Sequence, residues 1–316
     1  MPDIVDTETY FARLLAAPRP GGENVLAFYE HRLGVIGTDP RLMLIPLDDH
    51  LVHRGDGVFE TLKYIGGRLY QVGPHFARME RSAGAIFLEP PCPWDEVARL
   101  TTAVCRAGGA DTGMVRVIVG RGSGGFGIDP AECPTASLTI VAYRYHPRSP
   151  EDFARGVTAF RTSIPAKQNY LARIKSIDYL PNVLMRREAV QRGEDYPVCY
   201  DHRGFLAEGA TENICLVDAA GRLVVPELDN ALTGTTLMRA VELLKGEIEV
   251  VFTGIREEDI ATAREMMILG TTNDCLSIVR YNGAPVGDGK PGPVSRTLKT
   301  RIVADIAAHG SPIWEE

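Results

Sequence analysis

RIKSIDYLPNVL, residues Arg173–Leu184, places a single lysine, Lys175, between an extended segment and a helix. The helix is predicted over about 179–192, because apolar residues recur at helical spacing and Gly193 follows as an end signal. A lysine at such a junction has ordered backbone on both sides. What its amine does therefore depends on the residues that the rest of the chain brings to it.

Length and charge limit the class of protein. With 316 residues the chain suggests roughly two domains, and its net charge of −7 is spread along the sequence rather than gathered in blocks. Nucleic acid is therefore not an expected partner, since the positive field that collects it is missing. No apolar run reaches the ~18 residues of a membrane span, and the N-terminus lacks the pattern of an export signal. We expect no membrane contact and a cytoplasmic location.

The six cysteines lie far apart, without CxxC pairs and without histidines at ligand spacing. This distribution is typical of buried, reduced thiols in a cytoplasm. We expect neither a zinc site nor any other metal site.

The alternation of strand and helix signals predicts an α+β fold in two domains. The polar segment 145–152, which holds two prolines, is the best linker. It divides the chain into a smaller N-terminal α/β domain, 1–147, and a larger, strand-rich C-terminal domain, 148–316. Residues 1 to about 40 form an extension that the pattern leaves unassigned. Gly66-Gly67, between two apolar runs, predicts a β-hairpin.

Hydrophobic periodicity predicts the individual elements. In the N-terminal domain, strands are predicted at 42–46, 58–64, 114–119 and 137–143, and helices at 74–83 and 95–106. In the C-terminal domain, strands are predicted at 157–162, 197–200, 205–208, 214–217, 223–225, 248–252 and 265–269, and helices at about 179–192, 235–245 and 294–308.

The glycine-rich segment Gly120–Gly127 satisfies the pattern G-x-G-x-x-G and follows a predicted strand. In a dinucleotide-binding fold this turn opens directly into a helix whose N-terminus meets the pyrophosphate. Here Pro130 and Pro134 follow within a few residues, and such a sequence does not make that helix. The segment is interpreted as a flexible loop bordering a site, and a non-catalytic dinucleotide-binding protein is kept as a remote alternative.

Another set of residues supplies the groups that pyridoxal 5′-phosphate (PLP) needs. Lys175 is followed by Glu208 in FLAEGATEN, by LTGTT ending at Thr236 and by LGTT ending at Thr272. An amine forms the Schiff base, and a carboxylate keeps the pyridine nitrogen protonated. Backbone N–H groups and hydroxyls at a helix N-terminus bind the phosphate, and Arg78 offers it a bidentate charge partner.

In combination these residues resemble the class IV aminotransferases, the fold-type IV PLP enzymes. That family includes branched-chain aminotransferases, D-amino acid aminotransferases and aminodeoxychorismate lyases. The resemblance runs from about Leu42 to Leu298. Its motifs are His75-x-x-Arg-Met-x-x-Ser-Ala83, Ile174-Lys-Ser-Ile-Asp-Tyr-Leu-x-Asn-Val-Leu184, Glu208-Gly-x-x-x-Asn213, Leu232-x-Gly-x-Thr236, Gly270-Thr-Thr272 and Gly289-Lys-x-Gly-Pro293.

The resemblance implies a role for each matching residue. Lys175 would form the Schiff base and later move the α-proton of the substrate, and Glu208 would pair with the pyridine nitrogen. Tyr179 would hydrogen-bond the ring hydroxyl, with Tyr170 in an equally placed Asn-Tyr-Leu as the alternative. Lys167 competes with Lys175, but its spacing to the Glu208 motif is eight residues too long. The phosphate would be held by Arg78, Thr235, Thr236 and Thr271.

Different segments of the chain resemble family members that act on different substrates. The loop Gly124–Pro130 is similar to that of branched-chain enzymes and lacks the Arg-x-His pair of the bacterial D-amino acid enzyme. The segment Arg54–Thr61 is more similar to the lyases and D-enzymes, and Thr61 takes the position of a catalytic threonine in the lyases. The residues expected to contact substrate are Thr61, Arg116, Thr272 and Arg54.

We therefore predict an enzyme with a homodimeric assembly, as the resemblance implies. It is expected to be a PLP-dependent aminotransferase that moves an amino group from a branched-chain L-amino acid or a D-amino acid to a 2-oxo acid by a ping-pong mechanism. The alternative with the same cofactor is an aminodeoxychorismate lyase, which forms 4-aminobenzoate and pyruvate.

Overall fold

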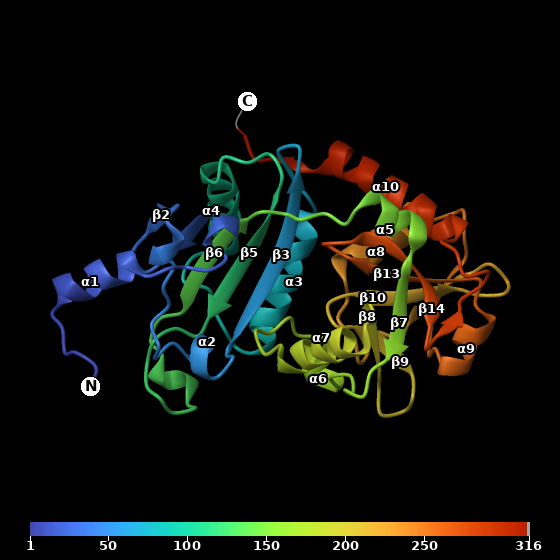
Figure 1. The fold of residues 1–316 in the computed structure, drawn as a ribbon, viewed down its shortest axis with the longest axis horizontal. Helices are drawn as coiled ribbons and strands as arrows, with labels where there is room; N and C mark the ends of the chain where they lie inside the picture. The colour runs from blue at the N-terminus through green and yellow to red at the C-terminus, as the bar shows by residue number, and fades with distance from the viewer. Residues whose placement is uncertain (315–316) are drawn as a thin grey trace.

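The strands of residues 1–314, the part of the chain that the computed structural model describes, form two sheets that lie side by side (Figure 1). The first, here the N-terminal sheet, has the strand order β16-β4-β3-β5-β6-β1-β2. Its members are β1 (Val25–Glu30), β2 (Val35–Gly37), β3 (Gly57–Ile65), β4 (Arg68–Leu69), β5 (Gly113–Gly120), β6 (Ser137–Tyr143) and β16 (Ser311–Pro312).

The second, here the C-terminal sheet, has the order β12-β11-β10-β13-β14-β7-β8-β9, with β15 paired to β14. Parallel pairings join β7 to β8, β7 to β14 and β11 to β12, so the sheet is mixed. Its members are β7 (Val157–Arg161), β8 (Tyr196–Tyr200), β9 (Leu206–Gly209), β10 (Asn213–Val217), β11 (Leu223–Pro226), β12 (Val250–Thr253), β13 (Glu265–Gly270), β14 (Asp274–Tyr281) and β15 (Ala284–Pro285).

Helices cover the sheets and connect them. The α-helices are α1 (Thr7–Ala16), α2 (His50–His53), α3 (Val72–Ala85), α4 (Trp94–Ala107), α5 (Pro150–Arg155), α6 (Asn169–Ala172), α7 (Leu180–Arg192), α8 (Thr235–Leu243), α9 (Glu257–Thr262) and α10 (Pro293–His309). Short 3₁₀ turns are η1 (Gly22–Asn24), η2 (Pro40–Leu42) and η3 (Pro130–Glu132).

The core of each half follows from its apolar periodicity. In the N-terminal half, Met79 of α3 and Val97 of α4 are fully buried against Leu62, Val117 and Ile140 of the sheet. In the C-terminal half, α8 and α10 bury a stripe of side chains against β10, β11, β13 and β14. The opposite face of that sheet has its own core, which α9 completes. The mixture of helices and strands confirms the predicted α+β class.

The predicted ends of elements are confirmed at two places where the backbone conformation favours glycine. Gly66 and Gly67 have φ of 56° and 70° and join β3 to β4 in the predicted hairpin. Helix α7 ends at Gly193, whose φ of 67° lies in the left-handed region that favours glycine after a helix. Both positions therefore define the ends of elements that carry the site.

The predicted strand at 42–46 is wrong. Residues 40–42 form the 3₁₀ turn η2, and the following segment pairs with no strand of residues 1–314. Leu42, Leu44 and Ile45 are 45%, 44% and 39% exposed, so the apolar run is not a core strand in the single chain. Pro40 and Pro46 flank the run and donate no backbone hydrogen bond, which disfavours a strand there.

The two ends of the chain depart from a simple two-part division. From the first 40 residues, β1 and β2 extend the N-terminal sheet, while α1 projects from the body with no buried residue (Figure 1). At the other end β16 returns from α10 to pair with β4. The boundary at 147/148 stays a prediction, and the last strand belongs to the sheet of the first half.

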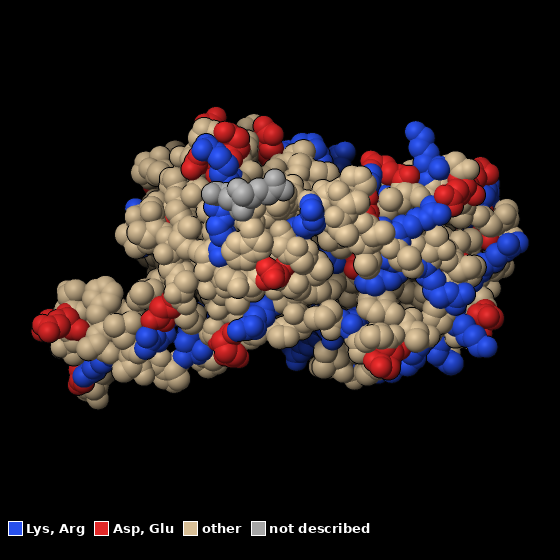
Figure 2. Space-filling view, turned by 90° about the horizontal axis from the view of Figure 1, so that it is seen from above, with Lys and Arg blue, Asp and Glu red and all other residues tan. Residues whose placement is uncertain are grey.

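Charges of both signs are interspersed over the face shown in Figure 2, in keeping with the evenly spread charge of the sequence. Within residues 1–314 no helix is long and apolar enough to cross a membrane. The same residues contain no group of three or more His, Cys, Asp or Glu side chains placed to hold a metal ion.

Candidate active site

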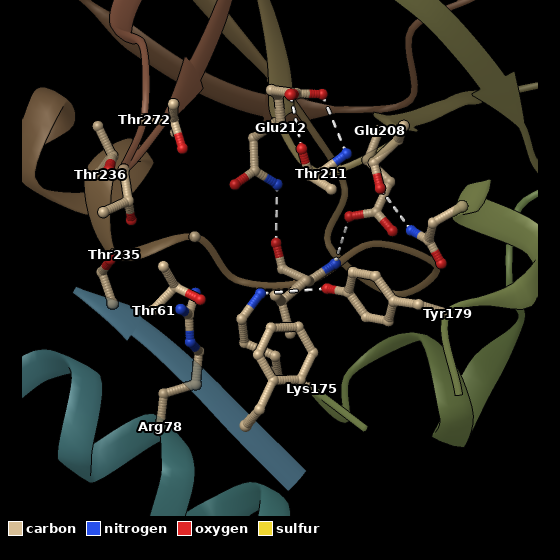
Figure 3. Close-up of a pocket in the computed structure, with 18 of the residues that line it drawn as sticks. Thr61, Arg78, Lys175, Tyr179, Glu208, Thr211, Glu212, Thr235, Thr236 and Thr272 are labelled. Carbon is tan, nitrogen blue, oxygen red and sulfur yellow. Dashed lines mark hydrogen bonds between the residues drawn. The ribbon is translucent and has the colours of Figure 1, made fainter. Parts of the chain in front are cut away.

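A cavity of about 390 Å³ lies where the two sheets meet. Strands β3 and β5 and helix α3 form one side, and the turns after β9, before α8 and after β13 form the other. The segment that carries Lys175 closes the cavity between them (Figure 3). Residues from both halves of the chain, more than 200 positions apart, therefore face one space.

The backbone of Lys175 is fastened to β3 and α3. Its carbonyl accepts from Phe59 N–H at 3.0 Å, and Ile177 N–H donates to the carbonyl of Gly57 at 2.9 Å. Its own N–H donates to Oγ of the buried Ser82 at 3.2 Å. The first two bonds hold the segment between α6 and α7 as an added edge of β3, and the third joins it to α3. The amine is thereby fixed at the junction that the sequence indicated.

The amine of Lys175 points at a phenol. Nζ donates to the hydroxyl of Tyr179 at 3.1 Å and lies 4.7 Å from the ring centre of Phe59 (Figure 3). Tyr179 therefore lies beside the amine. Tyr170, the alternative, instead donates to the carbonyl of Ala85 and does not line this cavity.

Lys167, the competing lysine, also lines the cavity, beside the Tyr179 ring. Its Nζ donates to the carbonyl of Asp178 at 2.7 Å and lies 4.8 Å from the ring centre of Tyr179. Burial lowers the pKa of Lys167 below its usual value. The structure thus places two lysines at the site, and only Lys175 contacts the tyrosine hydroxyl.

Glu208 lies at the end of β9 and opens onto the cavity. Its Oε2 accepts from Leu232 N–H at 3.1 Å, and within residues 1–314 it forms no ion pair at contact distance. Burial raises the pKa of Glu208 to about 7, against the lowering effect of the Leu232 N–H and of Lys175 and Lys167. A desolvated carboxyl without a cation is a fitting partner for a protonated ring nitrogen.

The opposite end of the cavity is built to receive an anion. Helix α8 begins at Thr235, directly after Gly234, and Thr235, Thr236 and Thr271 line the cavity. Gly234 has no room for a side chain, since a Cβ would come 1.8 Å from Oδ1 of Asn213. Asn213 in turn donates to the carbonyl of Leu232 at 2.7 Å, which fixes this turn. The helix N-terminus and its hydroxyls thus face the cavity, as a phosphate requires.

Arg78 reaches the same end of the cavity from α3 (Figure 3). Its Nε and Nη2 donate to the two carboxylate oxygens of Glu60 at 2.7 and 2.8 Å, and Nη1 donates to the carbonyl of Thr233 at 3.1 Å. Three of its five N–H groups are therefore used, and two are left for a ligand. His75 completes this buried cluster, with Nδ1 2.7 Å from Glu60 and Nε2 3.2 Å from Oγ1 of Thr235.

Glu60 was not anticipated from the sequence. Burial alone would raise its pKa, but the hydrogen bonds from Arg78 and His75 lower it to about 2. It is a buried acid in the apolar run Val58–Leu62, and a charge inside such a run is the signal that a buried partner exists. Four further cavity residues were not predicted, because turn and strand patterns do not show which way a side chain points. They are Asn182, Thr211, Glu212 and Tyr143.

The residues expected at the substrate separate into two groups. Thr61 and Arg116 stand on neighbouring strands, with Arg116 Nε donating to Thr61 Oγ1 at 3.2 Å, and Thr272 lies across the cavity from them. Arg54 does not line the cavity of its own chain. Its guanidinium donates instead to the carbonyls of Gly127 at 2.8 Å and of Phe126 at 2.5 Å.

The glycine-rich loop continues into η3, a 3₁₀ turn of three residues, and not into a long helix. Its Gly127 N–H is taken by Oε2 of Glu132 at 3.1 Å. The helix N-terminus that a pyrophosphate needs is therefore not built at this loop, as the prolines predicted.

Two kinds of comparison agree with this geometry. The family described as amino-transferase class IV matches residues 57–281. A D-amino-acid transaminase, chloroplastic, of Arabidopsis thaliana is 33% identical over 90% of this chain and 78% of its own. A branched-chain-amino-acid aminotransferase of Pseudomonas aeruginosa is 27% identical over 79% of this chain and 84% of its own.

Among solved structures, a T.th. branched-chain amino acid aminotransferase with pyridoxamine 5′-phosphate superposes with a TM-score of 0.85. The match is 21% identical and covers 90% of this chain and 95% of that one, so it establishes the shared fold. Since the family match takes in more than two thirds of the chain and the Arabidopsis relative exceeds 30% identity, this protein belongs to the class IV aminotransferases and is a PLP-dependent enzyme.

Proposed function

We propose that this enzyme transfers the amino group of a branched-chain L-amino acid or of a D-amino acid to a 2-oxo acid, with Lys175 as the catalytic residue. The observation that carries the proposal is that Lys175, Glu208 and the N-terminus of α8 with Thr235 and Thr236 line one cavity. They offer the amine, the carboxylate and the phosphate cup that PLP needs. When bound, PLP supplies an electron-accepting ring that acidifies the α C–H bond of an attached amino acid.

The chain's own groups would then have separate tasks. Arg78, Thr235, Thr236 and Thr271 bind the phosphate, and Glu208 stays ionised opposite the ring nitrogen because a cation there offsets its burial. Tyr179 orients the ring hydroxyl and the amine. Once freed from the cofactor, the amine of Lys175 would be the base that accepts the α-proton of the substrate and then donates it to the cofactor's aldehyde carbon. Its hydrogen bond to Tyr179 holds Nζ inside the cavity where that proton would be received. In the ping-pong cycle the first product leaves before the acceptor binds.

The substrate side of the cavity combines one cation with aromatic and apolar groups. The guanidinium of Arg116 lies 5.2 Å from the ring centre of Phe59 and 6.0 Å from that of Tyr143. Ile118 lines the wall beside them. Such a wall accepts a branched aliphatic side chain, and Arg116 gives an acidic acceptor a charge partner.

A homodimer is part of the proposal. The loop that Arg54 braces carries Phe126 and Ile128, which are 67% and 82% exposed, and it does not reach the cavity of its own chain. Exposed apolar side chains on a structured loop suit a contact with a second copy. The cytoplasmic location expected from the sequence stays a prediction; sedimentation of the purified protein tests the assembly.

The test is the near-visible absorbance of the protein reconstituted with PLP, before and after a panel of L- and D-amino acids is added without an oxo acid. If the L- or the D-enantiomer of an amino acid converts the absorbance band of the cofactor to that of its amine form, the result supports the proposal and identifies the donor. A band that no amino acid changes, together with pyruvate release from aminodeoxychorismate, favours the lyase. Thr61 in the cavity wall is the observation that keeps this second candidate. A protein that takes up no PLP contradicts both.

A further inference from the structure

A second cavity, of about 300 Å³, lies behind the active site, between α3 and the segment that leads into Lys175. Its charged lining residues are three arginines: Arg78 and Arg81 from α3, and Arg173 from the approach to Lys175. No Asp or Glu of the described chain lines it. The positive charge around this hollow favours the entry of an anion.

The charges of this cavity are only partly neutralised by the protein. Arg78 is paired with Glu60. Arg81 and Arg173, in contrast, make no side-chain hydrogen bond or ion pair with any residue of 1–314. Two guanidinium groups are thus gathered around one hollow with their donors unused, and each can bind an oxyanion through two parallel N–H groups.

Polar groups line the base and rim of the same cavity. Ser82, which is 1% exposed, accepts from Lys175 N–H and keeps its own hydroxyl proton for another acceptor. Tyr170 closes one side through its bond to the carbonyl of Ala85. Thr233 adds a further hydroxyl. The cavity therefore offers donors from its rim to its base.

We propose that this cavity binds a phosphate group, presented either as inorganic phosphate or as a small phosphate monoester, between Arg81 and Arg173. A phosphate carries close to two charges and three strong acceptor oxygens, which match two forked guanidinium groups and one hydroxyl better than the two oxygens of a carboxylate do. A volume of about 300 Å³ accommodates a small monoester.

The site is separate from the cofactor's phosphate cup but touches it. Arg81 and Arg173 do not line the active-site cavity, and Thr235, Thr236 and Thr271 do not line this one. Arg78, Ile174 and Leu232 line both. An anion held by Arg173 and Ser82 would contact the residues that hold the backbone of Lys175, so its binding is coupled to the catalytic lysine.

The test is calorimetric titration of the PLP-saturated enzyme at constant ionic strength, with inorganic phosphate in one series and glycerol phosphate in another. Saturation with PLP fills the phosphate cup. We expect saturable binding that weakens at least tenfold in Arg81→Gln/Arg173→Gln. The control Arg19→Gln/Arg187→Gln removes the same charge from two other exposed arginines and should bind as the wild type does.

The two series identify the source of the phosphate. Equal affinities indicate inorganic phosphate, and a monoester that binds tenfold more tightly indicates a phosphorylated metabolite. The proposal is overturned if neither anion binds, if Arg81→Gln/Arg173→Gln binds unchanged, or if the control variant loses binding equally. If the protein takes up no PLP, the comparison of variants still decides the question, because neither arginine lines the cup.

Discussion

Nζ of Lys175 donates a hydrogen bond to the hydroxyl of Tyr179 at 3.1 Å, four residues further along the chain. The bond spans the start of α7, whose first turn holds Tyr179 at its N-cap. Because β3 fixes the backbone of Lys175 and α7 fixes Tyr179, the amine has one defined direction into the cavity. The catalytic role that we assign to Lys175 depends on this relationship.

Tyr179→Phe removes the hydroxyl and keeps the ring. The loss of one hydrogen bond of about 1 to 1.5 kcal/mol predicts a fall of roughly tenfold in the rate of the amino-acid half-reaction. Stopped-flow absorbance of the cofactor band measures it. Tyr170→Phe is the matched control, since that tyrosine points at Ala85 and should leave the rate unchanged. Equal losses in both variants would contradict the assignment of Tyr179.

Glu60→Gln removes the carboxylate that pairs with Arg78. An uncompensated buried guanidinium costs roughly 3 to 5 kcal/mol, so we expect a lower urea midpoint and weaker PLP binding. The pKa of Glu60 is lowered to about 2 from 4.5, so its stabilisation is complete above pH 4.5 and is lost as the pH falls toward 2.

The gap between wild type and Glu60→Gln should therefore shrink as the pH falls from 4.5 toward 2. Glu80→Gln, on the exposed side of α3, is the control and should change neither quantity. If the difference in unfolding free energy between wild type and Glu60→Gln is unchanged at pH 3, the charge of the Glu60 carboxylate is not its cause.

For Glu208 we predict the opposite pH dependence of the unfolding free energy in the cofactor-free protein. Its pKa is raised to about 7 from 4.5, so ionisation opposes folding, and this cost grows as the pH rises from 4.5 to 7. This difference in pKa corresponds to about 3 kcal/mol. The free energy of unfolding of Glu208→Gln should therefore rise relative to that of wild type between pH 4.5 and 7. Urea unfolding of both proteins at pH 5 and pH 8 measures this difference.

With PLP bound we expect the order to reverse, because Glu208→Gln lacks the charge that would face the ring nitrogen. We expect its PLP affinity to fall by about tenfold or more, since a charge-assisted hydrogen bond contributes roughly 1.5 to 3 kcal/mol. Fluorescence titration with PLP measures the affinity. An affinity equal to that of wild type would remove Glu208 from the cofactor site.

Thr61→Val separates transamination from lyase chemistry. The change keeps the shape of the side chain and removes the oxygen that accepts from Arg116. If the enzyme is a transaminase, the half-reaction with its preferred amino acid should stay within tenfold of wild type, while any pyruvate release from aminodeoxychorismate disappears. Lyase activity that survives in Thr61→Val would exclude a catalytic role for this hydroxyl.

Much of the fold was readable from the sequence because local chemistry determined it. The glycines at 66, 67 and 193 adopt positive φ, and β6 has the predicted bounds. Strand β14 was not predicted, although it is central in its sheet. Asp274 and Ser277 make it look polar, and tertiary partners allow their burial. Lys63 and Lys299 pair with Asp274, Lys299 at 2.8 Å, and Ser295 lies 2.6 Å from Ser277.

The site was predictable to the extent that its residues stand in turns and at helix ends. Lys175 precedes α7, Glu208 lies at the end of β9, Thr235 and Thr236 begin α8, and Thr271 follows β13, and the structure brings them to one cavity. Glu60 lies inside a strand, where its charge signals a buried partner, but only the structure identifies that partner as Arg78 together with His75. Arg54 shows the converse, since its motif pointed to the site while its side chain braces a loop elsewhere.

We assign the cofactor to Lys175 and not to Lys167, although both lysines line the cavity. The direct measurement is borohydride reduction of the PLP-loaded enzyme, followed by proteolysis and mass spectrometry of the lysine peptides. We predict a phosphopyridoxyl label on Lys175, undiminished in Lys167→Ala and absent in Lys175→Ala. A label on Lys167 in the wild-type enzyme, or no labelled lysine at all, would contradict the account.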